Sequence, residues 1–495
     1  MSMRKSGVLL PIASLPGKYG IGSFSKYAYQ FVDQLKEAGQ SYWQILPLGP
    51  TGYGDSPYQS FSTYAGNPYF IDLEALIAEG LLKKTECDSC DFGKNARYID
   101  YEKLYLSRFK VLHIAYERSG ISRKKKFKEF IRENAYWLDD YALYMAVKNH
   151  FGGASFIEWD EDIRVRKPET LTEYRKKFAK EIEFYQFQQY KFTEQWTKLK
   201  KYANDQGIKI IGDIPIYVAF DSADTWAAPK LFQFDKDHMP IAVAGCPPDA
   251  FSATGQLWGN PLYDWTYHKK TGYEWWIKRI GYCFKLYDVV RVDHFRGFDE
   301  YYAIPYGHKT AEKGKWKKGP GIGIFKALAA KLGKADIIAE DLGFLTPSVI
   351  KLVKDTGYPG MKVLQFAFDS REESDYLPHN YTQNCVVYTG THDNNTTCGW
   401  YDELSRPDKK LSVAYLNNFN TPLKEISWDF IRLAQSSVAK LCIIPIQDYL
   451  CMGSEARINT PSSLGDNWKW RMSEKDINRK LLKRVFEMTR LYGRL

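Results

Sequence analysis

Eight short runs of aliphatic and β-branched residues divide this chain, and most of the segments between them have helical periodicity. Each run stays nearly continuously apolar up to a polar C-terminal end, which is typical of a strand buried on both faces of a parallel sheet. Strands that alternate with helices predict an α/β protein, and eight of them predict a (β/α)8 TIM barrel. The runs are residues 6–12, 41–48, 209–218, 288–295, 335–342, 360–366, 384–393 and 441–450.

The segments between the runs supply the crossover helices. Phe31 and Leu35 lie on one apolar stripe that stops at Gly39, so a helix is expected between the first two strands. Pro347 is expected to open another helix, because a first-turn position needs no amide hydrogen. Residues 367–383 show no apolar stripe. The link between the sixth and seventh strands is therefore the weakest match to the barrel pattern.

Two links are too long for simple crossovers. We interpret residues 1–495 as a single catalytic barrel with two large insertions at its C-terminal face. The first, 74–196, is expected to be mainly helical and to join strands 2 and 3. The second, 219–272, is rich in Gly, Pro, Trp and Asp, and is expected to be a loop-rich cover over the active site between strands 3 and 4.

Composition narrows the function classes. With 44% hydrophobic and 26% charged residues the chain is globular, and no run approaches the ~18 apolar residues that span a bilayer, so neither a membrane nor export is expected. The excess of ten positive charges is spread out, and its densest run, 123–128, is typical of a solvated helix face, so nucleic acid is not an expected partner. Among eight cysteines only Cys87 and Cys90 form a CxxC pair, which favours reduced thiols in the cytoplasm.

Polar residues end most of the predicted strands and should meet at the C-terminal mouth of the barrel. Several carboxylates there indicate glycosidic-bond chemistry or metal binding. Arg291 lies two residues from Asp293, on the same strand face, where its fixed cation would oppose a divalent ion and keep an aspartate ionised. No metal is therefore expected. The polar residues are Asp213, Arg291, Asp293, His294, Glu340, Asp341, His392, Asp393 and Asp448.

The spacing of two of these acids fits one reaction type. A single acid at a strand end usually caps a helix or forms an ion pair. Asp293 on the fourth strand and Glu340 on the fifth, however, fall on neighbouring strands about 4.8 Å apart. Retaining glycosidic chemistry needs a carboxylate nucleophile and a carboxylic acid about 5–5.5 Å apart. The sequence thus predicts such a pair, with Asp393 as a third acid.

Seven blocks of the sequence are similar to the 4-α-glucanotransferases (amylomaltase or disproportionating enzyme), and the similarity covers nearly the whole chain. The blocks are WQILPLGPTGYGDSPYQSFSTYAGNPYFIDL (43–73), GDIPIYVAFDSADTW (212–226), GCPPDAFSATGQLWGNPLYDW (245–265), RVDHFRGF (291–298), AEDLG (339–343), THDNNT (391–396) and EARINTP (455–461).

The resemblance implies roles for individual residues. Asp293 would be the nucleophile, Glu340 the general acid/base, and Asp393 the carboxylate that holds sugar hydroxyls and stabilises the transition state. No cofactor is implied, and the partners would be α-1,4-glucans and maltooligosaccharides. The residues implied to bind substrate are Tyr58, Asp213, Asp249, Gln256, Trp258, Arg291, His294, His392 and Asn467.

Two alternatives remain open at this stage. An α-amylase-type hydrolase would use the same three acids with water as the acceptor, although the third strand ends in Asp213-Ile-Pro-Ile-Tyr217 without the Asn-His pair usual in amylases. That difference favours the transferase. A non-catalytic starch-binding protein is less favoured, because a binding module gains nothing from adjacent acids that repel each other.

Overall fold

An eight-stranded parallel sheet organises the fold of the computed structural model, which describes residues 4–495 except 53, 249–251, 344 and 464. Each of the eight predicted runs overlaps one of its strands, so the strand predictions are confirmed. The strands are β1 (Lys5–Leu9), β2 (Tyr42–Gln44), β3 (Lys209–Pro215), β6 (Val289–Asp293), β9 (Ile337–Ala339), β10 (Gly360–Val363), β11 (Cys385–Tyr388) and β12 (Leu441–Pro445).

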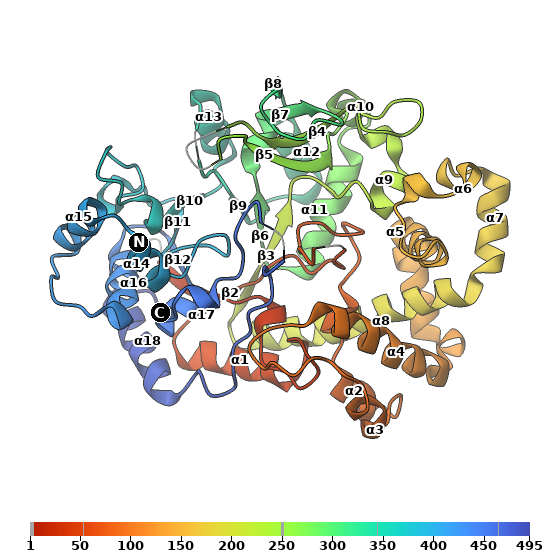
Figure 1. Cartoon of the computed structure of the whole chain (residues 1–495), viewed down its shortest axis with the longest axis horizontal. Coiled ribbons are helices and arrows are strands. Elements are labelled where there is room, and N and C mark those ends of the chain that lie inside the picture. The colour runs from red at the N-terminus through yellow and green to blue at the C-terminus, as the bar shows by residue number, and fades with distance from the viewer. Residues whose placement is uncertain (1–3, 53, 249–251, 344, 464) are drawn as a thin grey trace.

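The sheet curves back on itself. Its strand order is β10-β11-β12-β1-β2-β3-β6-β9, and every pair in this series is parallel. Hydrogen bonds join the two end strands, because the Ala339 N–H donates to the Pro359 carbonyl at 3.0 Å and the Met361 N–H donates to Asp341 Oδ1 at 2.7 Å. The predicted (β/α)8 barrel is confirmed, with its strands at the centre of Figure 1.

Amphipathic helices cover the outside of the barrel. The buried stripe of the first includes Phe31 and Leu35, and the chain leaves the helix through Gly39, whose φ of +69° favours glycine. Pro347 occupies the first turn of α13, as predicted. Residues 367–383, all of which are described, contain no α-helix. The helices after barrel strands are α1 (Lys26–Glu37), α8 (Ala179–Asp205), α11 (Glu274–Leu286), α12 (Ile322–Leu332), α13 (Pro347–Thr356), α14 (Thr397–Glu403), α15 (Arg406–Leu416), α16 (Ile426–Ser436), α17 (Ile446–Tyr449) and α18 (Arg479–Leu491).

A group of helices lies beside the barrel, on the right in Figure 1. It has its own apolar core, which includes Trp137, Tyr144 and Trp159. Tyr144 Oη and Lys148 Nζ each donate to Asp221 at 2.5 Å, so the group is tied to the segment that follows β3. In the described part of the chain no helix is long and apolar enough to cross a membrane. The helices with this separate core are α5 (Lys125–His150), α6 (Glu161–Arg164) and α7 (Pro168–Lys177), whereas α2 (Leu73–Ala78), α3 (Lys84–Asp88) and α4 (Tyr101–Ser119) place buried residues such as Leu76 and Leu112 in the large core around the barrel.

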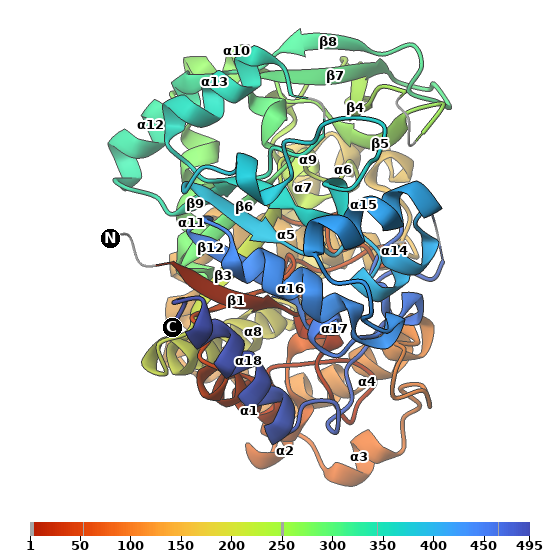
Figure 2. The same ribbon diagram turned by 90° about the vertical axis from the view of Figure 1, so that its left-hand side faces the viewer.

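A second, antiparallel sheet lies over one side of the barrel, at the top of Figure 2. Its order is β5-β4-β7-β8, so strands from the segment after β3 pair with strands from the segment after β6. The sequence analysis did not predict it, because QLWGNP and KWKK lack the β-branched content of a typical strand. The strands are β4 (Ala242–Cys246), β5 (Gln256–Pro261), β7 (Glu300–Pro305) and β8 (Lys315–Lys318), with α9 (Ala223–Ala227) and α10 (Trp265–Lys270) in the same region.

Candidate active site

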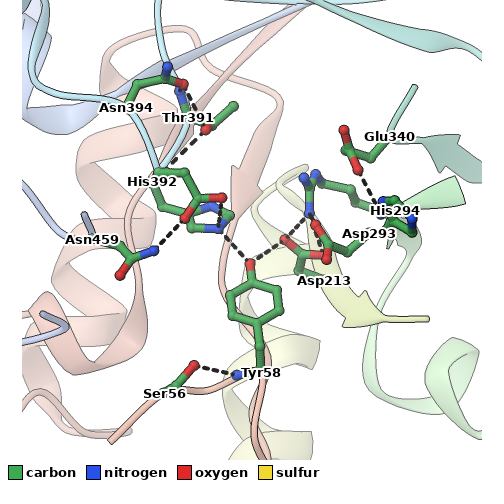
Figure 3. Close-up of polar contacts among 12 residues, drawn as sticks. Ser56, Tyr58, Asp213, Asp293, His294, Glu340, Thr391, His392, Asn394 and Asn459 are labelled. Atoms are coloured by element: carbon green, nitrogen blue, oxygen red, sulfur yellow. Dashed lines mark hydrogen bonds and ion pairs between the residues drawn. The ribbon is translucent and has the colours of Figure 1, made fainter. Parts of the chain in front are cut away.

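Arg291 is the cation at the centre of the barrel mouth. It lies on β6 opposite Asp213 on β3, and both side chains are buried. Arg291 Nη1 contacts the two Asp213 oxygens at 2.8 and 2.7 Å and Asp293 Oδ1 at 3.0 Å (Figure 3). Arg291 Nε donates to Met361 Sδ at 3.3 Å. The predicted placement of Arg291 and Asp293 on one strand face thus leads to a direct ion pair.

Glu340 lies directly beyond the neighbouring strand. Because β6 and β9 pair Val292 with Ala339, the next residue on each strand is one of the two predicted acids, Asp293 or Glu340. Two backbone N–H groups hold the Glu340 carboxylate: His294 donates to Oε2 at 2.6 Å and Leu342 to Oε1 at 3.0 Å. The left-handed backbone at His294, with φ +50°, turns the chain so that this N–H reaches Glu340.

The two acids are electrostatically coupled. Burial raises the pKa of Asp293 and that of Glu340, and the Arg291 guanidinium opposes the rise at both. Each carboxylate also raises the cost of ionising the other, since two like charges at one site do not ionise independently. Arg291 makes its ion pair with Asp293, whereas the oxygens of Glu340 accept from backbone amides. Donors therefore stabilise the ionised form of each acid, through an ion pair at Asp293 and through two backbone amides at Glu340.

Asp393 comes from the segment between β11 and α14, and a second segment holds it. Asn459 Nδ2 donates to Asp393 Oδ1 at 2.6 Å, and Arg457 Nη2 donates to the Asp393 carbonyl at 2.8 Å. The other carboxylate oxygen, Oδ2, lies 3.4 Å from His392 Nε2. The Asp393 side chain remains 42% exposed, so it can meet a ligand in the mouth. Neither Arg457 nor Asn459 was predicted, although both fall within the block 455–461.

Tyr58 connects the two halves of the site. Its hydroxyl donates to Asp213 Oδ2 at 2.9 Å and lies 2.8 Å from His392 Nε2, as Figure 3 shows. Since a carboxylate only accepts, the hydroxyl uses its proton on Asp213 and accepts from His392, which places the imidazole proton on Nε2. The Tyr58 and His392 rings stack at 5.2 Å, and Trp468 packs beside both. Trp468 was not among the predicted residues.

The antiparallel sheet brings aromatic residues over the other side of the mouth. Alternation along β5 leaves Gln256 and Trp258 half-buried and the intervening Leu257 exposed. The Trp258 ring meets the edge of His294 with centroids 4.8 Å apart, and Trp258 Nε1 donates to Gln256 Oε1 at 3.0 Å. The Nε2 atom of His294 is buried and has no hydrogen-bond partner among the described residues. It is therefore free to bond a ligand.

Burial lowers the pKa of His294 to about 4, so the ring is neutral at pH 7. An unfolded chain would protonate it near pH 6.5, so the native state should lose stability as the pH falls from about 6.5 to 4. We expect His294→Gln to reduce this loss, measured as the slope of unfolding free energy against pH.

His268, whose pKa burial also lowers to about 4, is the matched control outside the mouth. His268→Gln should reduce the slope without changing activity. An unchanged slope in His294→Gln would contradict the assignment.

Asn467 is the predicted residue that directly precedes Trp468. The amide of Asn467 bonds within its own loop, since Oδ1 accepts from the Thr460 N–H at 2.9 Å and Nδ2 donates to the Ser463 carbonyl at 2.9 Å. Asp249 lies outside the described residues. Among the residues that the structure does describe, no three His, Cys, Asp or Glu side chains form a metal-binding group.

The arrangement matches the requirements of glycosidic-bond chemistry. It offers a carboxylate beside a fixed cation, a second carboxyl group on the neighbouring strand, and a third acid in the segment after β11. Aromatic side chains flank these acids, and such faces pack well against sugar rings.

Comparisons with known proteins agree with this chemistry. The sequence profile of the 4-alpha-glucanotransferase family matches residues 10–477. The chain is 50% identical to a 4-alpha-glucanotransferase of Clostridium butyricum, over 98% of this chain and 99% of the relative. It is 48% identical to one of Streptococcus pneumoniae, over 100% and 98%. The solved amylomaltase of Streptococcus agalactiae in complex with acarbose is 42% identical and has a TM-score of 0.96, with 99% of each chain covered. The chain belongs to the 4-alpha-glucanotransferase family.

Proposed function

We propose that this enzyme moves segments of α-1,4-glucans between chains by a double displacement on Asp293. The observation that carries this proposal is the juxtaposition of Asp293 and Glu340 at the ends of two paired strands, with the Arg291 guanidinium 3.0 Å from Asp293 Oδ1. The guanidinium favours the ionised form of Asp293, which a nucleophile requires, and Glu340 is proposed to carry the proton that the leaving group takes.

In the first half-reaction, Asp293 Oδ attacks the anomeric carbon of the donor glucan. Glu340 gives its proton to the departing O4, the glycosidic bond breaks, and a covalent glucosyl-enzyme forms. The donor's reducing-end fragment then leaves with that proton. Once Asp293 is an ester its charge is gone, so the pKa of Glu340 falls and the residue becomes a base.

In the second half-reaction, the Glu340 carboxylate takes the proton from the 4-OH of an acceptor. The acceptor oxygen attacks the anomeric carbon and releases Asp293. Two inversions give net retention, and the same type of bond is remade. Asp393 is proposed to bond ring hydroxyls more strongly as the oxocarbenium ion forms, because only such differential binding lowers the barrier.

The remaining predicted residues are proposed to bind the glucan around this centre. The Streptococcus agalactiae amylomaltase was solved in complex with acarbose, which supports oligosaccharide binding by this related chain. His294 Nε2, which has no partner among the described residues, and the half-buried ring of Trp258 are suited to a sugar ring. The full proposed set is Tyr58, Asp213, Asp249, Gln256, Trp258, Arg291, His294, His392 and Asn467.

Segments 74–196 and 219–272 are proposed to act as walls and roof of this mouth. Roofing would exclude water from the glucosyl-enzyme and offer a surface to the acceptor, which favours transfer over hydrolysis. A cytoplasmic location is proposed as well, since the two cysteines of the CxxC pair, Cys87 and Cys90, are free thiols.

Incubation with pure maltotriose tests the proposal. A transferase should release glucose and build a ladder of longer maltooligosaccharides with almost no gain in total reducing ends, because every broken bond is remade. Reducing ends that rise in step with maltotriose loss would identify a hydrolase instead, and would overturn the transferase assignment.

Replacing Trp258 by Ala is expected to shift products toward hydrolysis. The change removes the ring that covers His294 and opens the mouth to water. The ratio of new reducing ends to consumed maltotriose should rise several-fold, while total donor turnover falls. Trp316→Ala, which removes an aromatic ring from β8 of the same sheet, is the control and should leave the ratio unchanged. An unchanged ratio in Trp258→Ala would contradict the proposed shielding.

A further inference from the structure

The segment 389–396, which carries His392 and Asp393, is neither helix nor strand, so side-chain contacts fix its shape. Its turn is held internally: the Thr391 N–H and Oγ1 both donate to Asn394 Oδ1 at 2.9 Å, as Figure 3 shows. The Asp393 N–H donates to Thr391 Oγ1 at 3.3 Å. The position of this turn relative to the barrel depends on the two ends of the segment and on hydrogen bonds from Gln365, Arg457 and Asn459 to its middle.

One buried carboxylate joins those two ends. Asp448 lies on α17 directly after β12, and 1% of it is exposed. Its Oδ2 accepts from Thr389 Oγ1 at 2.5 Å, immediately after β11. The same oxygen accepts from Thr397 Oγ1 at 2.7 Å, and Oδ1 accepts from the Thr397 N–H at 2.7 Å, at the start of α14. The carboxylate therefore fixes the entrance and the exit of the segment together.

These hydrogen bonds have no substitute nearby. No Lys, Arg or His in the described ranges forms an ion pair with Asp448, and Thr389 and Thr397 are fully buried. The Asp448 carboxyl group is therefore held by two hydroxyls and one amide. Water cannot replace a lost donor without entering the core. A buried carboxylate that loses a donor drives local rearrangement of the groups around it. The proposed reaction gives Asp448 no contact with the glucan.

We propose that Asp448 is a positioning residue, which sets the place of Asp393 in the mouth through Thr389 and Thr397. The inference rests on the proposed role of Asp393 in the transition state. Asp393 itself is held by Asn459 and Arg457, so the segment is fixed at its two ends by Asp448 and at the acid by these two residues. A small shift of the segment ends that Asp448 holds would move the Asp393 carboxylate away from the sugar hydroxyls. A misplacement of about 1 Å can cost about 100-fold in rate.

Thr397→Val tests the role, because valine keeps the shape and the backbone N–H but removes the hydroxyl. We expect kcat with maltotriose to fall about 10- to 100-fold while KM changes little, since the contacts at stake act mainly in the transition state. Thr397→Ser, which restores a hydroxyl, should recover most of kcat. Thr389→Val removes the hydrogen bond to Asp448 at the other end of the segment. It replaces Thr397→Val as the test if that variant does not fold. Unchanged kcat in the folded valine variant would overturn the proposal.

Thr489→Val is the matched control for loss of a buried hydroxyl. Thr489 is also fully buried, and its Oγ1 donates to the Val485 carbonyl at 2.9 Å within α18, outside the barrel. We expect it to lower the melting temperature as Thr397→Val does, but to leave kcat unchanged. If both variants lose the same fraction of kcat, the effect is one of general stability and the positioning role fails.

A double-mutant cycle separates this inference from the proposed function. Rates are measured with α-maltotriosyl fluoride, a reactive donor that keeps slow variants measurable. If Thr397 acts through Asp393, Thr397→Val should have almost no effect once Asp393→Asn is present. If Asp393→Asn is strongly impaired but Thr397→Val costs the same factor in both backgrounds, positioning is refuted and the function stands. Near-normal activity of Asp393→Asn alone would refute the proposed role of that acid, and the inference with it.

Discussion

Asp293→Asn is expected to lower kcat by at least about 10⁴-fold and to abolish the covalent intermediate, because an amide does not attack the anomeric carbon. The fold should survive, since asparagine still accepts from Arg291 and Asp213 keeps its ion pair with that cation. Turnover of maltotriose would measure the loss of kcat. Mass spectrometry of enzyme that has been incubated with α-maltotriosyl fluoride and then quenched would measure the covalent intermediate.

The control for Asp293→Asn is Asp224→Asn. Asp224 is also a buried acid, but its oxygens accept from the Thr63 N–H and hydroxyl at 2.8 Å, outside the proposed reaction centre. Asp224→Asn should lower the free energy of unfolding, with a much smaller loss of kcat than Asp293→Asn. Near-normal activity of a chemically verified Asp293→Asn protein would rule out the nucleophile assignment.

Glu340→Gln is expected to reduce kcat with maltotriose by about 10²–10⁴-fold, the usual cost of losing a positioned acid/base. With α-maltotriosyl fluoride as donor the first half-reaction should recover, since fluoride leaves without a proton. The glucosyl-enzyme should then accumulate, because the base that activates the acceptor is missing. If the covalent intermediate forms with maltotriose as fast as in the wild type, another residue must supply the proton.

The pH dependence of this variant gives a second readout. Because burial raises the pKa of Glu340, the wild-type enzyme should lose activity as the pH rises through that pKa and the acid loses its proton. Charging the buried group also costs folding free energy, so wild-type stability should fall over the same pH rise. Glu340→Gln should be more stable than the wild type at pH 7–8, with a difference that vanishes below about pH 4.3. Parallel stability curves would contradict this account.

The barrel and its principal acids could be predicted from the sequence for a local reason. A strand buried on both faces is nearly continuously apolar, and polar residues gather where it reaches the mouth. Asp293 and Glu340 were therefore located from two short stretches alone. Their position on neighbouring strands followed as well, because the pairing of Val292 with Ala339 makes each acid the next residue along its strand.

The antiparallel sheet could not be predicted in this way. Its strands are short, contain Gly, Pro and Lys, and pair across two different loops, so neither alternation nor proximity in sequence marks them. A loop-rich segment was expected at 219–272; within it β4 and β5 pair with each other, and β4 also pairs with β7 from the other loop. Pairing of this kind depends on the barrel that brings the loops together.

The contacts that complete the site are likewise a product of the tertiary structure. Tyr58 and His392 are 334 positions apart and Asn459 lies 66 positions beyond Asp393, yet both pairs are hydrogen-bonded. The sequence by itself determined which strands form and which acids end them, because burial and periodicity are local properties of the chain. Only the tertiary structure decided which loop side chains hold those acids, since irregular loops carry no periodicity and their hydrogen bonds are selected by packing.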